Sequence, residues 1–138
     1  NLGWCLWDGT LLDFGVIDLQ EVCKGTDYPK KIWMLKQQGF FDNADVILVE
    51  RQMQSRMKML ACAIRCFYYE RTKMIAPQSV RRHFKTLTKS HTKNKKAHVN
   101  YVQDYLHGPL LNKFKIHKKK DDISDTIMQL LYWLSSEE

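Results

Sequence analysis

The carboxylates near the end of the chain are the residues whose type and spacing first suggest chemistry. In the segment KKKDDISDTIMQLLYWL, residues 118–134, three lysines and three aspartates precede a helical pattern. On a helix, Asp122 and Asp125 lie three positions apart and project together. Nearly opposite them lies an apolar face made of Ile123, Ile127, Leu130, Leu131 and Leu134.

This aspartate pair supports two interpretations. Asp122 and Asp125 fit a capping box that satisfies free backbone N–H groups at a helix start. They also fit a site for a hard divalent cation such as Mg²⁺, which binds through one or two carboxylates and leaves room for substrate phosphates. The spacing alone leaves both interpretations open.

The positive charge of the chain is concentrated in one part of it. The net charge is +7, and residues 71–120 hold fourteen Lys or Arg against one acid, Asp104. The rest of the chain holds eight Lys or Arg against fourteen acids. Apolar residues such as Phe84 and Leu87 interrupt the basic part, which favours a nucleic-acid surface over a disordered tail. A solvated basic face is the alternative.

Length and composition indicate the broad class of the protein. The 138 residues, 44% of them hydrophobic, suit a single domain over residues 1–138. No segment has the length of a membrane span or the pattern of a signal peptide, so we expect an intracellular protein with no membrane partner. The four cysteines form no CxxC motif and are expected to be reduced packing residues.

The elements that must position the carboxylates begin with strands. Asp8-Gly9 between two apolar runs predicts a β-hairpin. The apolar run Val46–Val49 predicts a buried parallel strand with Glu50 at its C-terminal tip. Open α/β sheets bind ligands at the carboxyl ends of their strands, so Glu50 is a candidate third carboxylate beside the aspartate pair.

Helical spacing predicts the elements between the strands and after them. Helices are expected over residues 30–41, 53–71 and 97–106, a short strand in KMIAP, a helical turn in VRRHF, and a loop over 86–95 that precedes a break at Gly108-Pro109. The 53–71 helix has a core stripe of Met53, Met57, Leu60, Ala61, Ile64 and Phe67. The pattern predicts an α/β domain with a mixed sheet flanked by helices.

Three carboxylates beside a basic stretch fit metal-assisted phosphodiester hydrolysis. In that chemistry one ion positions and ionises the attacking water and a second stabilises the leaving oxygen. Glu50, Asp122 and Asp125 would hold the ions, and the lysines would hold the DNA.

Four blocks of sequence resemble one known family. ILVERQ with QSR close behind, KNKKAHVNYVQDYL and KKKDDISDTIMQLLYWL occur in this order over nearly the whole chain. They resemble the corresponding blocks of the Holliday junction resolvases of poxviruses and fungal mitochondria. Those enzymes are similar to the bacterial junction resolvase and share the ribonuclease H-like fold. Each block alone is weak, whereas their order is specific.

The resemblance implies a magnesium-dependent endonuclease that nicks two opposing strands of a four-way DNA junction. Glu50, Asp122 and Asp125 match the metal-binding catalytic carboxylates, for two Mg²⁺ ions that Mn²⁺ can replace. Lys96 falls where the family has a basic catalytic residue near the scissile phosphate. The residues expected to bind DNA are Arg51, Arg81, Arg82, Lys93, Lys95 and Lys96.

The resemblance also implies a homodimer, with the Met53–Phe67 helix contributing to the subunit interface. The protein would be located in the host cytoplasm if it is poxvirus-like and in the mitochondrion if it is fungal-like. The alternatives are a ribonuclease H-like nuclease acting on other branched or hybrid nucleic acid, and a module that binds branched DNA without cutting it.

One departure from the family lies at the start of the chain. Family members begin with a strand carrying Asp-x-Gly, whose aspartate is the first metal ligand, and NLGW at residues 1–4 corresponds to the region after it. Asp8 and Asp13 do not replace this aspartate, because Asp8 belongs to the predicted turn and Asp13 to the next strand. We therefore expect the sequence to omit an N-terminal segment of the natural protein.

Overall fold

The computed structural model describes residues 1–85 and 90–137, apart from the side chain of His91. The chain divides into two compact units. The terminal unit joins Asn1–Ile17 to Gln78–Glu138, and the central unit is Asp18–Pro77. This division leaves the prediction of one domain over residues 1–138 untested.

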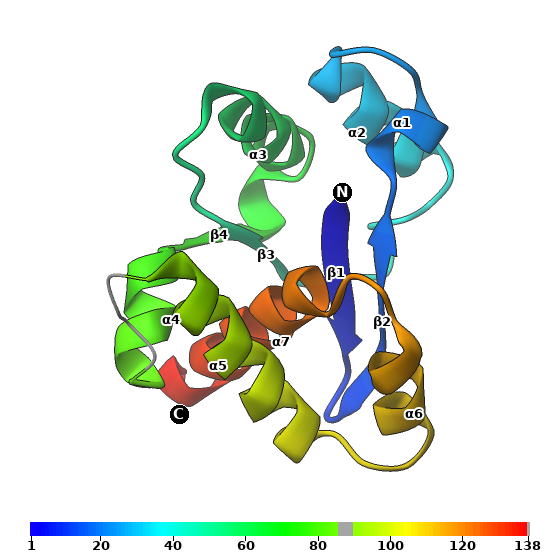
Figure 1. The fold of residues 1–138 in the computed structure, drawn as a ribbon. Coiled ribbons are helices and arrows are strands. Elements are labelled where there is room, and N and C mark those ends of the chain that lie inside the picture. Colours follow the sequence, from blue (N-terminus) through cyan, green and yellow to red (C-terminus); the bar gives the residue numbers. More distant parts are fainter. Residues whose placement is uncertain (86–89, 138) are drawn as a thin grey trace. The chain divides into compact units, whose positions relative to one another are not determined.

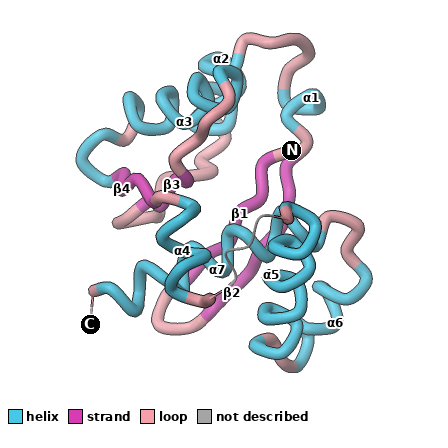
Figure 2. The backbone as a smooth tube through the Cα atoms, turned by 60° about the vertical axis from the view of Figure 1, so that its left-hand side comes forward, coloured by secondary structure: helices cyan, strands magenta, loops and turns pink. Residues whose placement is uncertain are grey.

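The terminal unit begins with the predicted hairpin (Figures 1 and 2). Strands β1 (Leu2–Trp7) and β2 (Leu11–Ile17) pair in antiparallel fashion, with Leu2 opposite Ile17. Gly9 in the connecting turn has φ +72°, a left-handed conformation that glycine adopts without steric cost. The hairpin prediction is confirmed.

Four helices complete the terminal unit: α4 (Pro77–His83, whose first residue belongs to the central unit), α5 (His91–Tyr105), α6 (Gly108–Ile116) and α7 (Lys120–Ser136). Helix α7 packs along β1 and against α5 (Figure 1). Fully buried Ile123 and Ile127 lie on α7. Phe14 of β2 meets Phe114 of α6 edge to face, with ring centroids 6.2 Å apart. The apolar face of the last helix is therefore part of this unit's core.

One prediction for the basic segment is wrong. Residues 91–95 of the expected loop form the first turn of α5, while residues 86–89 lie outside the described residues. The Ser90 side chain accepts a hydrogen bond from the backbone N–H of Lys93, a helix cap that outweighs the loop-like composition. The predicted break at Gly108-Pro109 is confirmed, because α5 ends at Tyr105; the same two residues also begin α6, where proline suits the first turn.

The central unit contains the predicted parallel strands. Its elements are α1 (Leu19–Val22), α2 (Tyr28–Gln37), β3 (Ile47–Glu50), α3 (Ser55–Phe67), the 3₁₀ helix η1 (Tyr69–Arg71) and β4 (Thr72–Ile75). Strands β3 and β4 pair in parallel, and α3 lies in the connection between them (Figure 1). Ile47 and Val49 are buried, as expected for a covered parallel pair, whereas Val46 of the predicted run precedes β3 and is 39% exposed.

The predicted stripe on the 53–71 helix is only partly confirmed. Leu60, Ala61 and Ile64 are buried, whereas Met53 precedes α3 and is 82% exposed. Phe67, the last residue of α3, is 37% exposed. The helix therefore buries its middle turns and leaves apolar residues uncovered at both ends of the predicted range.

The mixed α/β class is confirmed. The described strands pair as two two-stranded sheets, one antiparallel and one parallel. A single mixed sheet of ribonuclease H type stays a prediction. Within residues 1–85 and 90–137, no helix combines the length and apolar character needed to cross a bilayer.

Candidate functional site

The aspartate pair lies in the first two turns of α7, at positions that contradict the capping-box interpretation. The helix begins at Lys120, and Lys119 is its N-cap residue, with no capping bond from its side chain. Asp122 is thus the third helical residue rather than the N-cap, and it and Asp125 are half-buried. A capping box therefore does not account for the two carboxylates.

Strand β1 approaches the first turn of α7 closely at Gly3. A Cβ atom placed on Gly3 would lie 2.6 Å from the backbone oxygen of Asp122, closer than real Cβ contacts allow. One turn further along α7, the Cys5 thiol lies 3.6 Å from the backbone oxygen of Thr126. Glycine at position 3 therefore sets how near Asp122 lies to the strand.

The environment of Asp122 disfavours its negative charge. Burial, followed by the charge of Asp121 and, more weakly, that of Asp125, raises the pKa of the Asp122 carboxyl above its ordinary value of 3.8. The positive charge of the Asn1 amino group and, more weakly, that of Lys119 oppose this shift without cancelling it. A partly desolvated carboxylate beside like charges gains most from a bound cation.

Asp125 is held by a buried histidine on the neighbouring helix. Nδ1 of His98 lies 2.8 Å from Oδ1 of Asp125, with 5% of the histidine side chain exposed against 41% of the aspartate. Because this contact uses one carboxylate oxygen, it fixes the orientation of the group. A carboxylate positioned by such a partner is typical of metal-binding sites.

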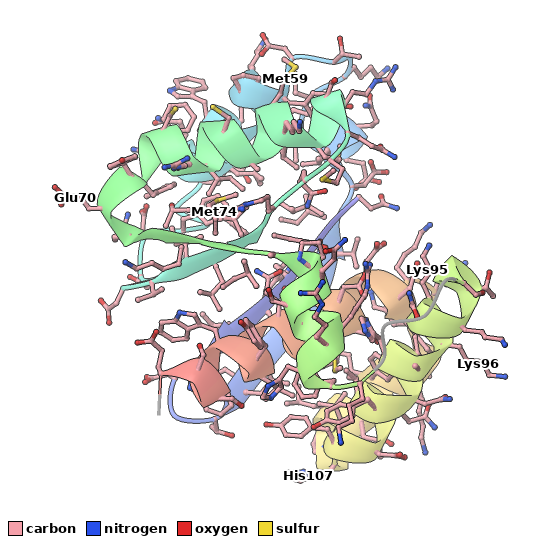
Figure 3. All side chains as sticks on the ribbon, turned by 90° about the vertical axis from the view of Figure 1, so that its left-hand side faces the viewer. Met59, Glu70, Met74, Lys95, Lys96 and His107 are labelled. Carbon is pink, nitrogen blue, oxygen red and sulfur yellow. The ribbon has the colours of Figure 1, made fainter. Side chains whose placement is uncertain are left out.

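Helix α5 also places lysines beside the aspartates. The Lys95 ammonium lies 3.5 Å from Oδ2 of Asp121, and both side chains are substantially exposed. Lys93 and Lys96 are exposed as well. Figure 3 shows Lys95 and Lys96 on the early turns of α5, with the Lys96 side chain extending outward. The start of α5 therefore presents cations next to the carboxylates of α7.

The remaining predicted DNA-binding residues lie on other elements. Arg82 is exposed on α4, and Arg81 of the same helix is half-buried. Arg51, exposed just after β3, donates its backbone N–H to the oxygen of Ile75, 2.8 Å away, which extends the parallel pairing.

Glu50 is the last residue of β3, as predicted. It is half-buried, and the Gln52 side-chain amide lies 3.3 Å from its backbone oxygen and 3.5 Å from its Oε2. Glu50 belongs to the central unit, whereas Asp122 and Asp125 belong to the terminal unit. The meeting of the three carboxylates therefore stays a prediction.

The chemistry of the α7 pair fits a hard divalent cation. Asp122 and Asp125 supply oxygen ligands one turn apart, and the raised pKa of Asp122 reflects unfavourable charge that a cation would relieve. In the part of the chain that the structure describes, no three or more His, Cys, Asp or Glu side chains are grouped so as to hold a metal.

Comparison with known proteins gives no relative. No protein-family model, curated protein or solved structure matches this chain. The resemblance to the junction resolvases accordingly rests on the sequence blocks alone.

Two contributors to the site were missed in the sequence. His98 follows Lys95 by three positions and precedes the buried Val102 by four, a spacing that places all three toward one side of a helix. That signal was available once residues 91–105 were taken as one helix. The role of Gly3 was not accessible, because it depends on which element packs against β1.

Proposed function

We propose that this protein is a magnesium-dependent, structure-specific endonuclease that resolves four-way DNA junctions by paired nicking. The main support is the arrangement at the start of α7, where Asp122 and Asp125 are half-buried. His98 of α5 orients Asp125, and Lys95 of α5 lies beside Asp121. The family resemblance supplies the reaction and the ribonuclease H-like fold.

The roles of the residues follow from their chemistry. Asp122 and Asp125 hold the cation through carboxylate oxygens, and the resemblance adds Glu50 as a third ligand. Bound Mg²⁺ supplies charge stabilisation at the scissile phosphate and an ionised water as nucleophile. His98 keeps the Asp125 carboxylate in a fixed orientation.

The cations of α5 and α4 hold the DNA backbone. Lys93 and Lys96 are exposed on α5, and Arg82 is exposed on α4. Such side chains neutralise phosphates and position the duplex without reading its sequence. Lys95 lies next to Asp121, which immediately precedes the proposed metal ligand Asp122. In this proposal Lys96 lies near the scissile phosphate, as in the family.

Paired nicking requires two active sites on one junction. The proposal therefore includes a homodimer, which sedimentation of the full-length protein tests directly. A protein that stays monomeric when it is bound to a junction would contradict paired nicking.

The decisive experiment measures cleavage by the full-length protein. Rates with Mg²⁺ are compared on a four-way junction, a flap, an RNA–DNA hybrid and a linear duplex. We expect the junction to be cut fastest, and Asp122→Asn and Asp125→Asn to abolish cutting while leaving junction affinity nearly unchanged. Asp104→Asn, an exposed acid on α5, is the matched control and should cut normally.

Other results would favour the alternative functions. Equal cutting of all four substrates, or preference for the hybrid, would indicate a less selective ribonuclease H-like nuclease. Junction binding by the full-length protein without nicking at any Mg²⁺ concentration would indicate a binding module. Normal cutting by either aspartate variant would remove the proposed metal ligands.

The basic surface is tested separately through the salt dependence of binding. Replacing Lys95 and Lys96 with Gln should weaken junction binding and flatten the plot of log affinity against log salt. Each phosphate contact releases counterions from the DNA, and the variant makes fewer such contacts. Identical salt slopes for this variant and the wild type would exclude these lysines from the DNA contact.

A further inference from the structure

The central unit contains a basic hollow in which two cations, Lys58 and Arg65, have no role in the proposed nuclease chemistry. The hollow has a volume of about 370 Å³ and lies between α3 and the ends of the parallel strands. Its lining residues are Arg51, Gln52, Lys58, Ala61, Cys62, Arg65 and Met74. Three of these residues are cations and none is an acid.

The floor of the hollow is apolar and its walls are charged. Ala61 is buried and Met74 is half-buried, whereas Lys58 and Arg65 are exposed. Figure 3 shows Met74 on the side of α3 that faces the strands, with Met59 on the other side of the helix. A closed floor with cationic walls suits an anion that remains partly in water.

Arg65 is held in place by an aromatic ring. Its guanidinium lies 5.5 Å from the centroid of the exposed Tyr69 ring. Stacking on a ring limits the rotamers of an arginine and leaves its N–H groups able to reach a phosphate. Arg65 is thus more ordered than an isolated surface cation.

The spacing of the cations suits a chain of phosphates. Lys58 and Arg65 are seven residues apart on α3, which corresponds to about 10 Å along the helix axis. Phosphates on one DNA strand advance about 3.4 Å each along the duplex axis, so the two side chains are far enough apart to contact different phosphates. Arg51 supplies a third cation from the strand side of the hollow.

We propose that this hollow is a second backbone-phosphate site, through which Lys58 and Arg65 extend the DNA contact along α3. The proposal rests on the proposed function, because it makes the ligand a nucleic-acid strand. Gln52 lines the hollow and also contacts Glu50, so the hollow begins beside the strand-end carboxylate of the same unit. DNA bound near Glu50 would continue onto these cations.

Charge argues against a second copy of the chain as the occupant of the hollow itself, whereas the other faces of α3 stay available for the proposed homodimer. A two-fold interface through the hollow would bring the same lining of both subunits together, and that lining holds three cations and no acid. Like charges opposed across an interface are unfavourable. A polyanion carries the complementary charge.

The test compares two double variants that remove equal charge from the central unit. Lys58→Gln with Arg65→Gln removes the proposed contacts, and Lys24→Gln with Lys30→Gln removes two exposed cations outside the hollow. Binding of a labelled four-way junction is measured in EDTA, to prevent cleavage, over a series of salt concentrations. The slope of log affinity against log salt should fall by about 1.8 for the hollow variant, or about 0.9 per lost phosphate contact, and by less than half of that for the control.

Further measurements distinguish the loss of the Arg65 charge from other effects of changing this side chain, from a folding defect and from a protein interface. Arg65→Lys keeps the charge and should retain the wild-type slope, and circular dichroism should show that all variants are folded. Equal slopes for the two double variants would overturn the proposal. A dimer-to-monomer change with unaltered DNA slope would identify the hollow as a protein interface and would also overturn it.

The salt-slope test of the phosphate site does not depend on whether the protein cleaves DNA. A reduced slope in a protein that never nicks DNA would support the phosphate site and refute the nuclease. Junction cleavage with an unchanged salt slope in the hollow variant would support the nuclease and refute the phosphate site. Failure of the wild type to bind DNA would refute both proposals.

Discussion

Nδ1 of His98 and Oδ1 of Asp125 lie 2.8 Å apart and join the two helices that form the proposed metal site. The histidine side chain is 5% exposed, so the contact is made at the edge of the core and not in open solvent. A hydrogen bond from a buried group is worth more than one between exposed side chains, because the histidine has little water to replace it. The pair therefore serves both the packing of α5 on α7 and the orientation of a proposed ligand.

Removing the histidine should affect stability and metal binding together. His98→Ala leaves a cavity and removes the partner of Asp125, so we expect a loss of about 2–3 kcal/mol in the free energy of unfolding. Loss of such a supporting contact typically costs about 10–100-fold in metal affinity. Urea unfolding with and without Mg²⁺ measures both effects. Asn100→Ala, at an exposed position of α5, is the control and should change neither.

Asp122 should make the stability of the protein depend on pH. Because burial, with the charges of Asp121 and Asp125, raises its folded-state pKa above 3.8, the fold favours the protonated carboxyl. The stabilisation that protonation provides is fully present below about pH 3.8 and is lost as the pH rises through the raised pKa. Asp122→Asn should therefore be more stable than the wild type at neutral pH in EDTA.

The pH series gives this prediction its control. Thermal unfolding is followed at several pH values without divalent ions, and the advantage of Asp122→Asn should shrink toward the acid end. An equal or lower melting temperature for the variant at pH 7 would show that Asp122 is not disfavoured by its surroundings. If Asp122→Asn melts at a higher temperature than the wild type at pH 7 but no longer cleaves DNA, the Asp122 charge is kept for function and not for stability.

Gly3 should be intolerant of a side chain because of the backbone that it meets. In Gly3→Ala the new Cβ would lie 2.6 Å from the backbone oxygen of Asp122, so the strand or the helix must shift. We expect a loss of about 1–3 kcal/mol in the free energy of unfolding, the usual range for overpacking. Gly15→Ala is the control, because its Cβ meets the Trp4 side chain at 3.0 Å rather than backbone at 2.6 Å. Equal losses in the two variants, measured by urea unfolding, would contradict a specific role for Gly3.

The hairpin, the parallel strand and the final helix were predictable from the sequence. Asp8-Gly9 specified the hairpin because few sequences adopt the required turn, and the run ending at Glu50 specified a buried parallel strand by its lack of polar residues. The final helix followed from the spacing of Ile123 and Ile127, both of which are fully buried.

The parts that depend on packing were not predictable. Met53 fits the helical stripe but lies outside the helix, because periodicity does not report where a helix starts. Composition predicts a loop at residues 91–95. In the structure these residues are helical, and the Ser90 side chain caps the start of the helix. The contact of Asp125 with His98 depends on how two helices pack, which the spacing within each helix does not determine.

The four cysteines should differ widely in reactivity. Burial raises the pKa of the Cys5 thiol to about 11, only partly opposed by a hydrogen bond with Thr126, so about one molecule in a thousand carries the Cys5 thiolate at pH 8. Cys62 and Cys66 are exposed on α3, with sulfur atoms 3.9 Å apart, and the contact with Cys62 raises the pKa of Cys66.

Iodoacetamide at pH 8 should therefore modify Cys62 first, then Cys66, and Cys5 slowest, as followed by mass spectrometry of the peptides. Because the thiolate is the reactive form, the Cys5 rate should keep rising beyond pH 9, whereas an ordinary thiol with a pKa of 9.0 approaches its plateau there. In denaturant all the cysteines should react at similar rates, which shows that the differences come from the fold. Native Cys5 labelled as fast as Cys62 would mean that α7 does not cover β1 as described, and the position of Asp122 beside Gly3 would then need revision.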